Sequence, residues 1–130
     1  MLRFIAEHPK RRASFARYPA VTVTSLTDPF DDDMLAVVRA EFRHHAKFGR
    51  RLHVIDLDQV NGPGSAVFRL LITVLRIVRE VGGDVRLVST RPAMRRMLQI
   101  SALDRVFSVH LSVKDAVIAF REMAEEEAAS

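Results

Sequence analysis

The chain has 130 residues, of which 48% are hydrophobic, and it contains no cysteine. This length fits one packed domain, and the lack of cysteine excludes a disulfide framework, a cysteine-based zinc site and a thiol nucleophile. Basic residues outnumber acidic ones by 20 to 16, but the excess lies in short runs at predicted turns, so we expect no nucleic-acid binding. The longest apolar stretch, residues 67–81, is interrupted by arginines and a glutamate, which predicts a cytoplasmic protein without an integral membrane segment.

The N-terminal part of the sequence alternates between apolar and charged segments. Residues 2–6 form a short apolar run typical of a strand. Residues 8–17 are highly charged and contain a proline, which predicts a loop or a wide hairpin turn. We therefore treat residues 1–19 as an N-terminal extension of strand and loop. Residues 20–26 alternate small and β-branched side chains and predict a strand of the main sheet.

The next segment predicts a helix from about residue 33 to residue 47. Aspartates open it, where they complement the positive end of the helix dipole, and apolar residues recur at helical spacing. The side chains expected on its buried stripe are Leu35, Val38, Phe42 and His45. Residues 52–57 then predict a buried strand, and the glycine- and proline-containing residues 58–64 predict a loop.

A second helix is expected to begin at Ser65 and to stop at Gly82 and Gly83, because glycine adopts the left-handed conformation of a helix end at little cost. Its apolar face is the longest in the chain. The residues expected to line it are Val67, Leu71, Val74, Val78 and Val81, widened by Phe68, Leu70 and Leu75. We therefore expect this helix to supply much of the core.

The last third of the chain continues the alternation. Residues 84–89 predict a strand, Pro92 stands in the first turn of a third helix, and residues 106–109 predict a short strand. A last helix follows Ser112. The third helix is expected to bury Met94, Met97, Leu98 and Ile100, and the last one Ala116, Val117, Phe120 and Met123. Residues 125–130 are expected to form a solvated acidic tail.

The order of these elements predicts the fold class. From residue 20 onward, strands and amphipathic helices alternate, which is typical of parallel strands joined by helical crossovers. We therefore predict one α/β domain over residues 20–124.

Several motifs inside this domain carry a family resemblance. Asp56 and Leu57 end the predicted strand 52–57, and Ser65 comes nine positions after that acid. Residues 91–98 read R-P-A-M-R-R-M-L, and residues 103–107 read L-D-R-V-F. In this order and spacing the motifs resemble the STAS family, the sulfate-transporter and anti-sigma-factor-antagonist domains. The resemblance implies a mixed, mostly parallel sheet with about four helices mainly on one face.

The resemblance also implies a bacterial regulatory protein-binding module, without a cofactor and without enzymatic activity. In anti-sigma factor antagonists, a serine or threonine at the start of the second helix is phosphorylated by the partner, an anti-sigma factor that is also a serine kinase. The unmodified form binds that partner and frees the sigma factor for transcription. The alternative role for the same fold is a STAS accessory subunit of a membrane transport complex of the lipid-transport ABC type. The expected assembly is a monomer or a homodimer.

The sequence departs from the family at the switch itself. The family's loop reads Asp-Ser-Ser/Thr-Gly, whereas residues 64–67 read G-S-A-V, so Ala66 stands at the usual acceptor position. Phosphorylation could fall only on the neighbouring Ser65, and the alternative is that Ser65 is a plain helix N-cap. The residues predicted to bind the partner are Asp56, Asn61, Gly62, Gly64, Ser65, Ala66 and Arg69. For Asp56 the alternatives are a magnesium ligand and a hydrogen bond to a neighbouring loop.

The remaining patterns give little sign of metal chemistry. His44 and His45 are adjacent on a helix and point about 100° apart, so they are not expected to share a metal ion. Residues 31–33, all aspartate, lack the spaced acids of a calcium loop and are expected to cap the first helix. We therefore predict no metal site.

Two further patterns bear on ligand binding. The loop 61–64 matches no phosphate-binding motif, so no nucleotide site is predicted. Arg91, Arg95 and Arg96 either meet an acidic partner or form a solvated helix face.

Overall fold

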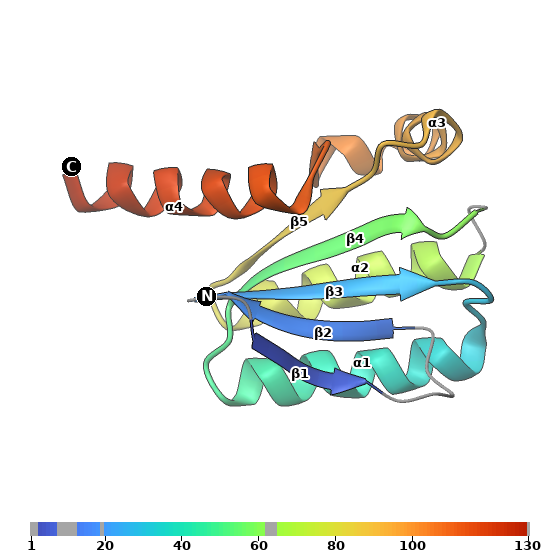
Figure 1. Ribbon diagram of the computed structural model, residues 1–130, viewed down its shortest axis with the longest axis horizontal. Helices are drawn as coiled ribbons and strands as arrows, with labels where there is room; N and C mark the ends of the chain where they lie inside the picture. Colours follow the sequence, from blue (N-terminus) through green and yellow to red (C-terminus); the bar gives the residue numbers. More distant parts are fainter. Residues whose placement is uncertain (1–2, 8–12, 19, 62–64, 130) are drawn as a thin grey trace.

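A single six-stranded sheet runs through the protein, with its strands in the order of the sequence (Figure 1). The computed structural model describes residues 3–7, 13–18, 20–61 and 65–129. The strands are β1 (Arg3–Glu7), β2 (Ala13–Tyr18), β3 (Val21–Thr27), β4 (Leu52–Gln59), β5 (Asp84–Val88) and β6 (Ser108–His110). The pairs β1–β2 and β2–β3 are antiparallel, and the pairs from β3 to β6 are parallel. This is the mixed, mostly parallel sheet that the resemblance implies.

Helices connect the parallel strands. They are α1 (Asp32–Lys47), α2 (Ser65–Glu80), α3 (Pro92–Ile100) with the short 3₁₀ turn η1 (Leu103–Arg105), and α4 (Val113–Ala129). The side chain of Asp31 accepts a hydrogen bond of 3.0 Å from the backbone N–H of Met34, which caps α1 as predicted. Among the described residues, no helix is both long and apolar enough to cross a bilayer.

The two faces of the sheet carry separate apolar clusters. On one face α1, α2 and α3 pack over side chains such as Ile55 and Leu87. On the other face α4 packs alone, with Ala116, Val117 and Phe120 against Val23 and Val54. Strand β4 is buried on both faces, and His53, Val54 and Ile55 are buried in succession along it. The helices therefore lie mainly on one face, as expected.

The core of the larger face is built from the predicted stripes. Val38 and Phe42 of α1 and Leu71, Val74 and Val78 of α2 are fully buried. The prediction that Ile100 and Val81 are buried is wrong: Ile100 is 70% exposed and Val81 is 38% exposed. Ile100 is the last residue of α3, and Val81 follows the last residue of α2, so neither lies over the sheet.

Gly83 lets two chain segments approach each other closely. A Cβ atom built at this position would lie 2.1 Å from the backbone oxygen of Arg51. That oxygen accepts a hydrogen bond from the N–H of Asp84 at 3.0 Å. The predicted stop at the glycine pair is therefore confirmed, and Gly83 also joins the starts of β4 and β5.

The ends of the chain differ from the sequence prediction. Residues 13–18, predicted as loop, form β2 and pair with β3 over six positions. The ladder of β3 provides partners that override weak local strand signals. The strand predicted at 106–109 lies at Ser108–His110. Residues 125–129, predicted as a tail, continue α4 as helix.

Candidate partner-binding site

The predicted site lies where the parallel strands end. The carboxyl ends of β3, β4 and β5 meet along one edge of the sheet, and α1, α2 and α3 begin there. In open α/β sheets this edge is the usual location of binding sites, because loops from several strands converge on it. The loop after β4 is the central one, and it contains Asn61 and leads to Ser65.

Hydrogen bonds tie this loop to the segments on both sides. The backbone N–H of Asn61 donates to Oδ2 of Asp28 at 2.6 Å, which joins the loop to the end of β3. Nη1 of Arg91 donates to Oδ1 of Asn61 at 2.6 Å, and Nε of Arg91 donates to the backbone oxygen of Asp58 at 2.7 Å. Asn61 is therefore held between the segments that follow β3 and β5, the two strands that flank β4.

Asp58 strengthens the connection to the start of α3. Its Oδ1 accepts hydrogen bonds from the backbone N–H of Thr90 at 2.7 Å and from the Thr90 hydroxyl at 3.1 Å. Asp28, Asp58 and Thr90 are not among the residues that the sequence predicts to bind the partner. Their position directly after a predicted strand is the signal that could have found them.

Ser65 is the first residue of α2 and is exposed. One turn later, Arg69 forms an ion pair with Asp32 in the first turn of α1 and donates from Nε to the backbone oxygen of Ser65 at 3.4 Å. The pair joins the starts of α1 and α2 beside Ser65. Gly62 and Gly64 lie outside the described residues, and the role of Ser65 as an N-cap stays a prediction.

Ala66 and Asp56 do not share the surface of Ser65. Ala66 is 6% exposed and faces the core. Asp56 pairs in register with Val88, which packs against α4, whereas its neighbours Ile55 and Leu57 face α1 and α2. Alternation along the strand thus directs the Asp56 side chain to the α4 face.

The Asp56 carboxylate accepts a hydrogen bond of 3.0 Å from the N–H of Asp58, which lies in the same strand β4, so this bond is not the predicted one to a neighbouring loop. Burial raises the pKa of Asp56 above its usual value, and that hydrogen bond opposes the rise.

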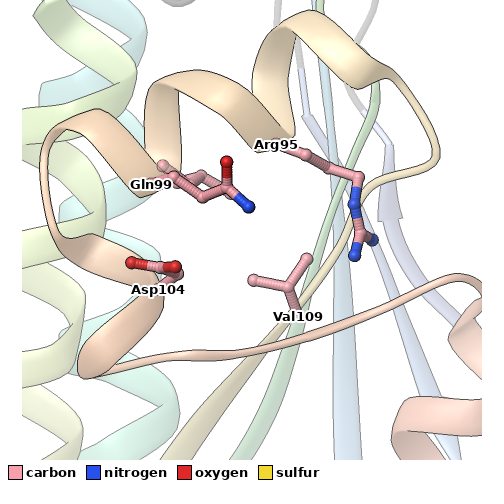
Figure 2. Close-up of a pocket in the computed structure, with 5 residues that line it drawn as sticks. Arg95, Gln99, Asp104 and Val109 are labelled. Atoms are coloured by element: carbon pink, nitrogen blue, oxygen red, sulfur yellow. The ribbon is translucent and has the colours of Figure 1, made fainter.

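Two features of the described part of the structure bear on metal and small-molecule binding. Among the described residues, no group of three or more histidines, aspartates or glutamates is placed to hold a metal ion. A cavity of about 80 Å³ lies between α3, η1 and β6, lined by residues that include Arg95, Gln99, Asp104 and Val109 (Figure 2). It is smaller than the roughly 300–1,000 Å³ of typical small-molecule sites.

The arginines of the α3 segment divide into two groups. Arg91 is bound in the loop network, and Arg95 donates from Nη1 to the backbone oxygen of Ser89 at 3.0 Å. Arg96 is exposed. The first two thus brace the ends of β4 and β5 rather than extend freely into solvent.

Two histidines are buried in the protein, His45 on α1 and His53 on β4. His45 is 3% exposed and His53 is fully buried, with their ring centres 6.2 Å apart, whereas His44 is exposed. Nε2 of His53 donates to the backbone oxygen of Arg50 at 2.9 Å, so the ring can bind there as a neutral imidazole. Burial lowers the pKa of His53 to about 4.

The fold is therefore an α/β domain with a six-stranded sheet, and loops from three parallel strands converge at the edge where those strands end. The sequence model of the STAS domain matches residues 13–116. The chain belongs to the STAS domain family.

Individual relatives point in the same direction. "Putative anti-sigma factor antagonist BtrV" of Bordetella bronchiseptica is 30% identical over 84 residues, which cover 65% of this chain and 72% of that protein. The structure resembles TM1081 of Thermotoga maritima with a TM-score of 0.77 at 18% identity, covering 90% of this chain and 94% of the other. It also resembles the phosphorylated form of the Bacillus cell fate determinant SpoIIAA, with a TM-score of 0.63, 19% identity and coverage of 90% and 98%.

Proposed function

We propose that this protein is a regulatory binding module of the anti-sigma factor antagonist type. It acts in the cytoplasm by contacting an anti-sigma factor that is also a serine kinase. The contact surface includes the loop after β4 and the start of α2, around Asn61, Ser65 and Arg69. The observation that carries the proposal is the exposed Ser65 at the start of α2, beside a loop braced by Asp28, Asp58 and Arg91.

The hydrogen bonds of Asn61 support binding because they fix this residue in place before a partner arrives. A surface that needs no reordering loses less conformational entropy when it binds. The neighbouring Arg69–Asp32 ion pair holds the starts of α1 and α2 together. A partner therefore meets a surface of defined shape.

Phosphorylation of Ser65 is the proposed control of this contact. A phosphate at a helix start adds a charge of about −1.5 to −2 and accepts hydrogen bonds from free backbone N–H groups. The helix itself would tolerate that charge, and no acidic residue lies in the first turn of α2. A partner carboxylate facing Ser65 would be repelled, so the modification would release the partner without unfolding the domain.

The experiment compares Ser65→Asp with Ser65→Ala. Aspartate keeps a capping oxygen but places a charge in the contact, whereas alanine removes the oxygen and leaves the surface neutral, at a cost of about 0.5–2 kcal/mol if Ser65 caps the helix. Ser65→Asp should therefore bind the partner at least tenfold more weakly than Ser65→Ala, because burying an unpaired charge costs several kcal/mol. Thermal unfolding should rank the two variants in the opposite order.

The partner is recovered by pull-down with the wild-type chain, identified, purified and titrated against each variant. Mass spectrometry of the native protein tests whether Ser65 carries a phosphate. Equal affinity of the two variants would reduce Ser65 to a helix residue outside the contact.

A further inference from the structure

The exposed side of α2 carries a regular row of residues that point away from the core. The row is Ser65, Arg69, Ile72, Arg76 and Arg79, and all five are exposed. Their spacing of four, three, four and three residues places them on one stripe of the helix, opposite the buried Leu71, Val74 and Val78. We call this row the α2 stripe.

The centre of the α2 stripe is apolar. Ile72 is 49% exposed, although its neighbours Leu70 and Leu71 are fully buried. A depression of about 490 Å³ lies beside it, lined by Ile72, Leu75, Arg76, Arg79 and Glu80. Leu75 also packs against the core, so the floor of this depression is continuous with the hydrophobic interior.

Positive charge surrounds that apolar centre. Helix α2 contains three arginines, all on the stripe, and one glutamate. Arg69 is paired with Asp32, whereas no ion pair of Arg76 or Arg79 is found among the residues whose side chains are described. An apolar contact flanked by arginines fits a partner with the opposite pattern, an apolar ridge flanked by carboxylates.

We propose that the α2 stripe is a docking surface for an acidic amphipathic helix of the partner. Spacing of four and three residues is the spacing at which two helices pack along a common seam. The exposed Ile72 favours such a helix over a nucleic acid backbone, which offers charge but no apolar ridge. The proposal rests on the proposed function in one respect: Ser65 begins the stripe, so a phosphate there would face the acidic side chains of the docked helix and oppose docking.

The test uses the full chain and a synthetic peptide of about 20 residues, long enough to be helical in water. The peptide carries leucines along one side and glutamates beside them, and a control peptide carries lysines in place of the glutamates. Binding is followed by the amide signals of the ¹⁵N-labelled protein. The acidic peptide should shift the signals of residues 65–80 and bind more weakly at high salt, because the charges are exposed.

Two charge reversals provide the matched comparison. Arg76→Glu lies on the stripe, and Arg121→Glu lies on an exposed position of α4, across the sheet. Arg76→Glu should weaken binding of the acidic peptide about tenfold, whereas Arg121→Glu should change it less than twofold. Both substitutions are on exposed helix positions, so thermal unfolding should confirm that both variants fold.

Three results would overturn the proposal: signal shifts located away from α2, equal binding of the lysine peptide, or equal effects of the two reversals. The proposal would also be overturned if the Kd of the acidic peptide were above about 1 mM, or if duplex DNA bound as tightly as the peptide. The titration needs neither the native partner nor a change at Ser65. Its failure therefore leaves the proposed function standing, and the Ser65 comparison tests that separately.

Discussion

Two regions of the molecule are stabilised by different interactions. One is the interior beneath α1 and α2, and the other is the edge where β3, β4 and β5 end. The interior consists of side chains such as Phe42, Leu71 and Leu87, all fully buried. The edge consists of hydrogen bonds among exposed groups such as Asp58, Thr90 and Arg91. Burial contributes most of the free energy of folding, whereas exposed hydrogen bonds contribute little net free energy but define local geometry. Substitutions in the interior and at the edge can therefore alter stability and binding separately in this protein.

The largest expected effect on stability comes from the buried side of α2, and the exposed side of the same helix provides the comparison. Leu71→Ala should lower the free energy of unfolding by about 2–5 kcal/mol, because the truncated side chain leaves a cavity in a close-packed core. Ile72→Ala changes the next residue, which is 49% exposed, and should cost far less. Urea unfolding of both variants measures the difference. Equal losses would mean that the two faces of α2 are not distinct.

The next effect depends on pH and comes from His53. Its pKa is lowered from 6.5 to about 4 by burial, so the folded protein holds the ring neutral while the unfolded chain binds a proton below pH 6.5. Stability should therefore fall as the pH drops from about 6.5 to about 4, by roughly 3 kcal/mol from this group alone. Below pH 4 the ring is protonated in both states, and no further loss arises from it.

The measurement is the free energy of unfolding as a function of pH for three chains. His53→Gln should flatten the slope between pH 6.5 and 4 relative to the wild type. His44→Gln, which changes an exposed histidine on α1, should leave the slope unchanged. A slope that survives in His53→Gln would assign the pH dependence to other groups.

The smallest expected effect concerns the edge. Asp58→Ala removes the acceptor for the N–H and hydroxyl of Thr90, both in exposed hydrogen bonds, so the global loss should be about 1 kcal/mol or less. The local effect should be large: hydrogen exchange of the Thr90 amide should accelerate strongly. Asp104→Ala, an exposed aspartate in η1, is the control and should leave that amide unchanged. Unchanged exchange in Asp58→Ala would show that the bond does not order the loop.

Much of the fold could be predicted because its signals are local. The buried stripe of α2, the aspartate cap of α1 and the glycine stop before β5 each follow from residues close together in sequence. The alternation of strands and helices then leaves few topologies, because parallel strands require helical crossovers. The family resemblance is carried by other local motifs, at Asp56 and Leu57, at Ser65 and in residues 91–98 and 103–107, and it is confirmed by the STAS match over residues 13–116.

The arrangement of the site could be predicted less well, because it depends on which strands become neighbours. Asp28, Asn61 and Arg91 are separated by 30 or more residues along the chain, and only the pairing of β3, β4 and β5 brings them together. The sequence prediction places Asp56 with Ser65 among the partner-binding residues, yet strand alternation directs its side chain to the α4 face. Strand β2 likewise forms from a charged segment because β3 offers it a complete ladder of backbone partners. Apolar periodicity is a property of each segment, whereas hydrogen-bond partners across a sheet are properties of the assembled chain.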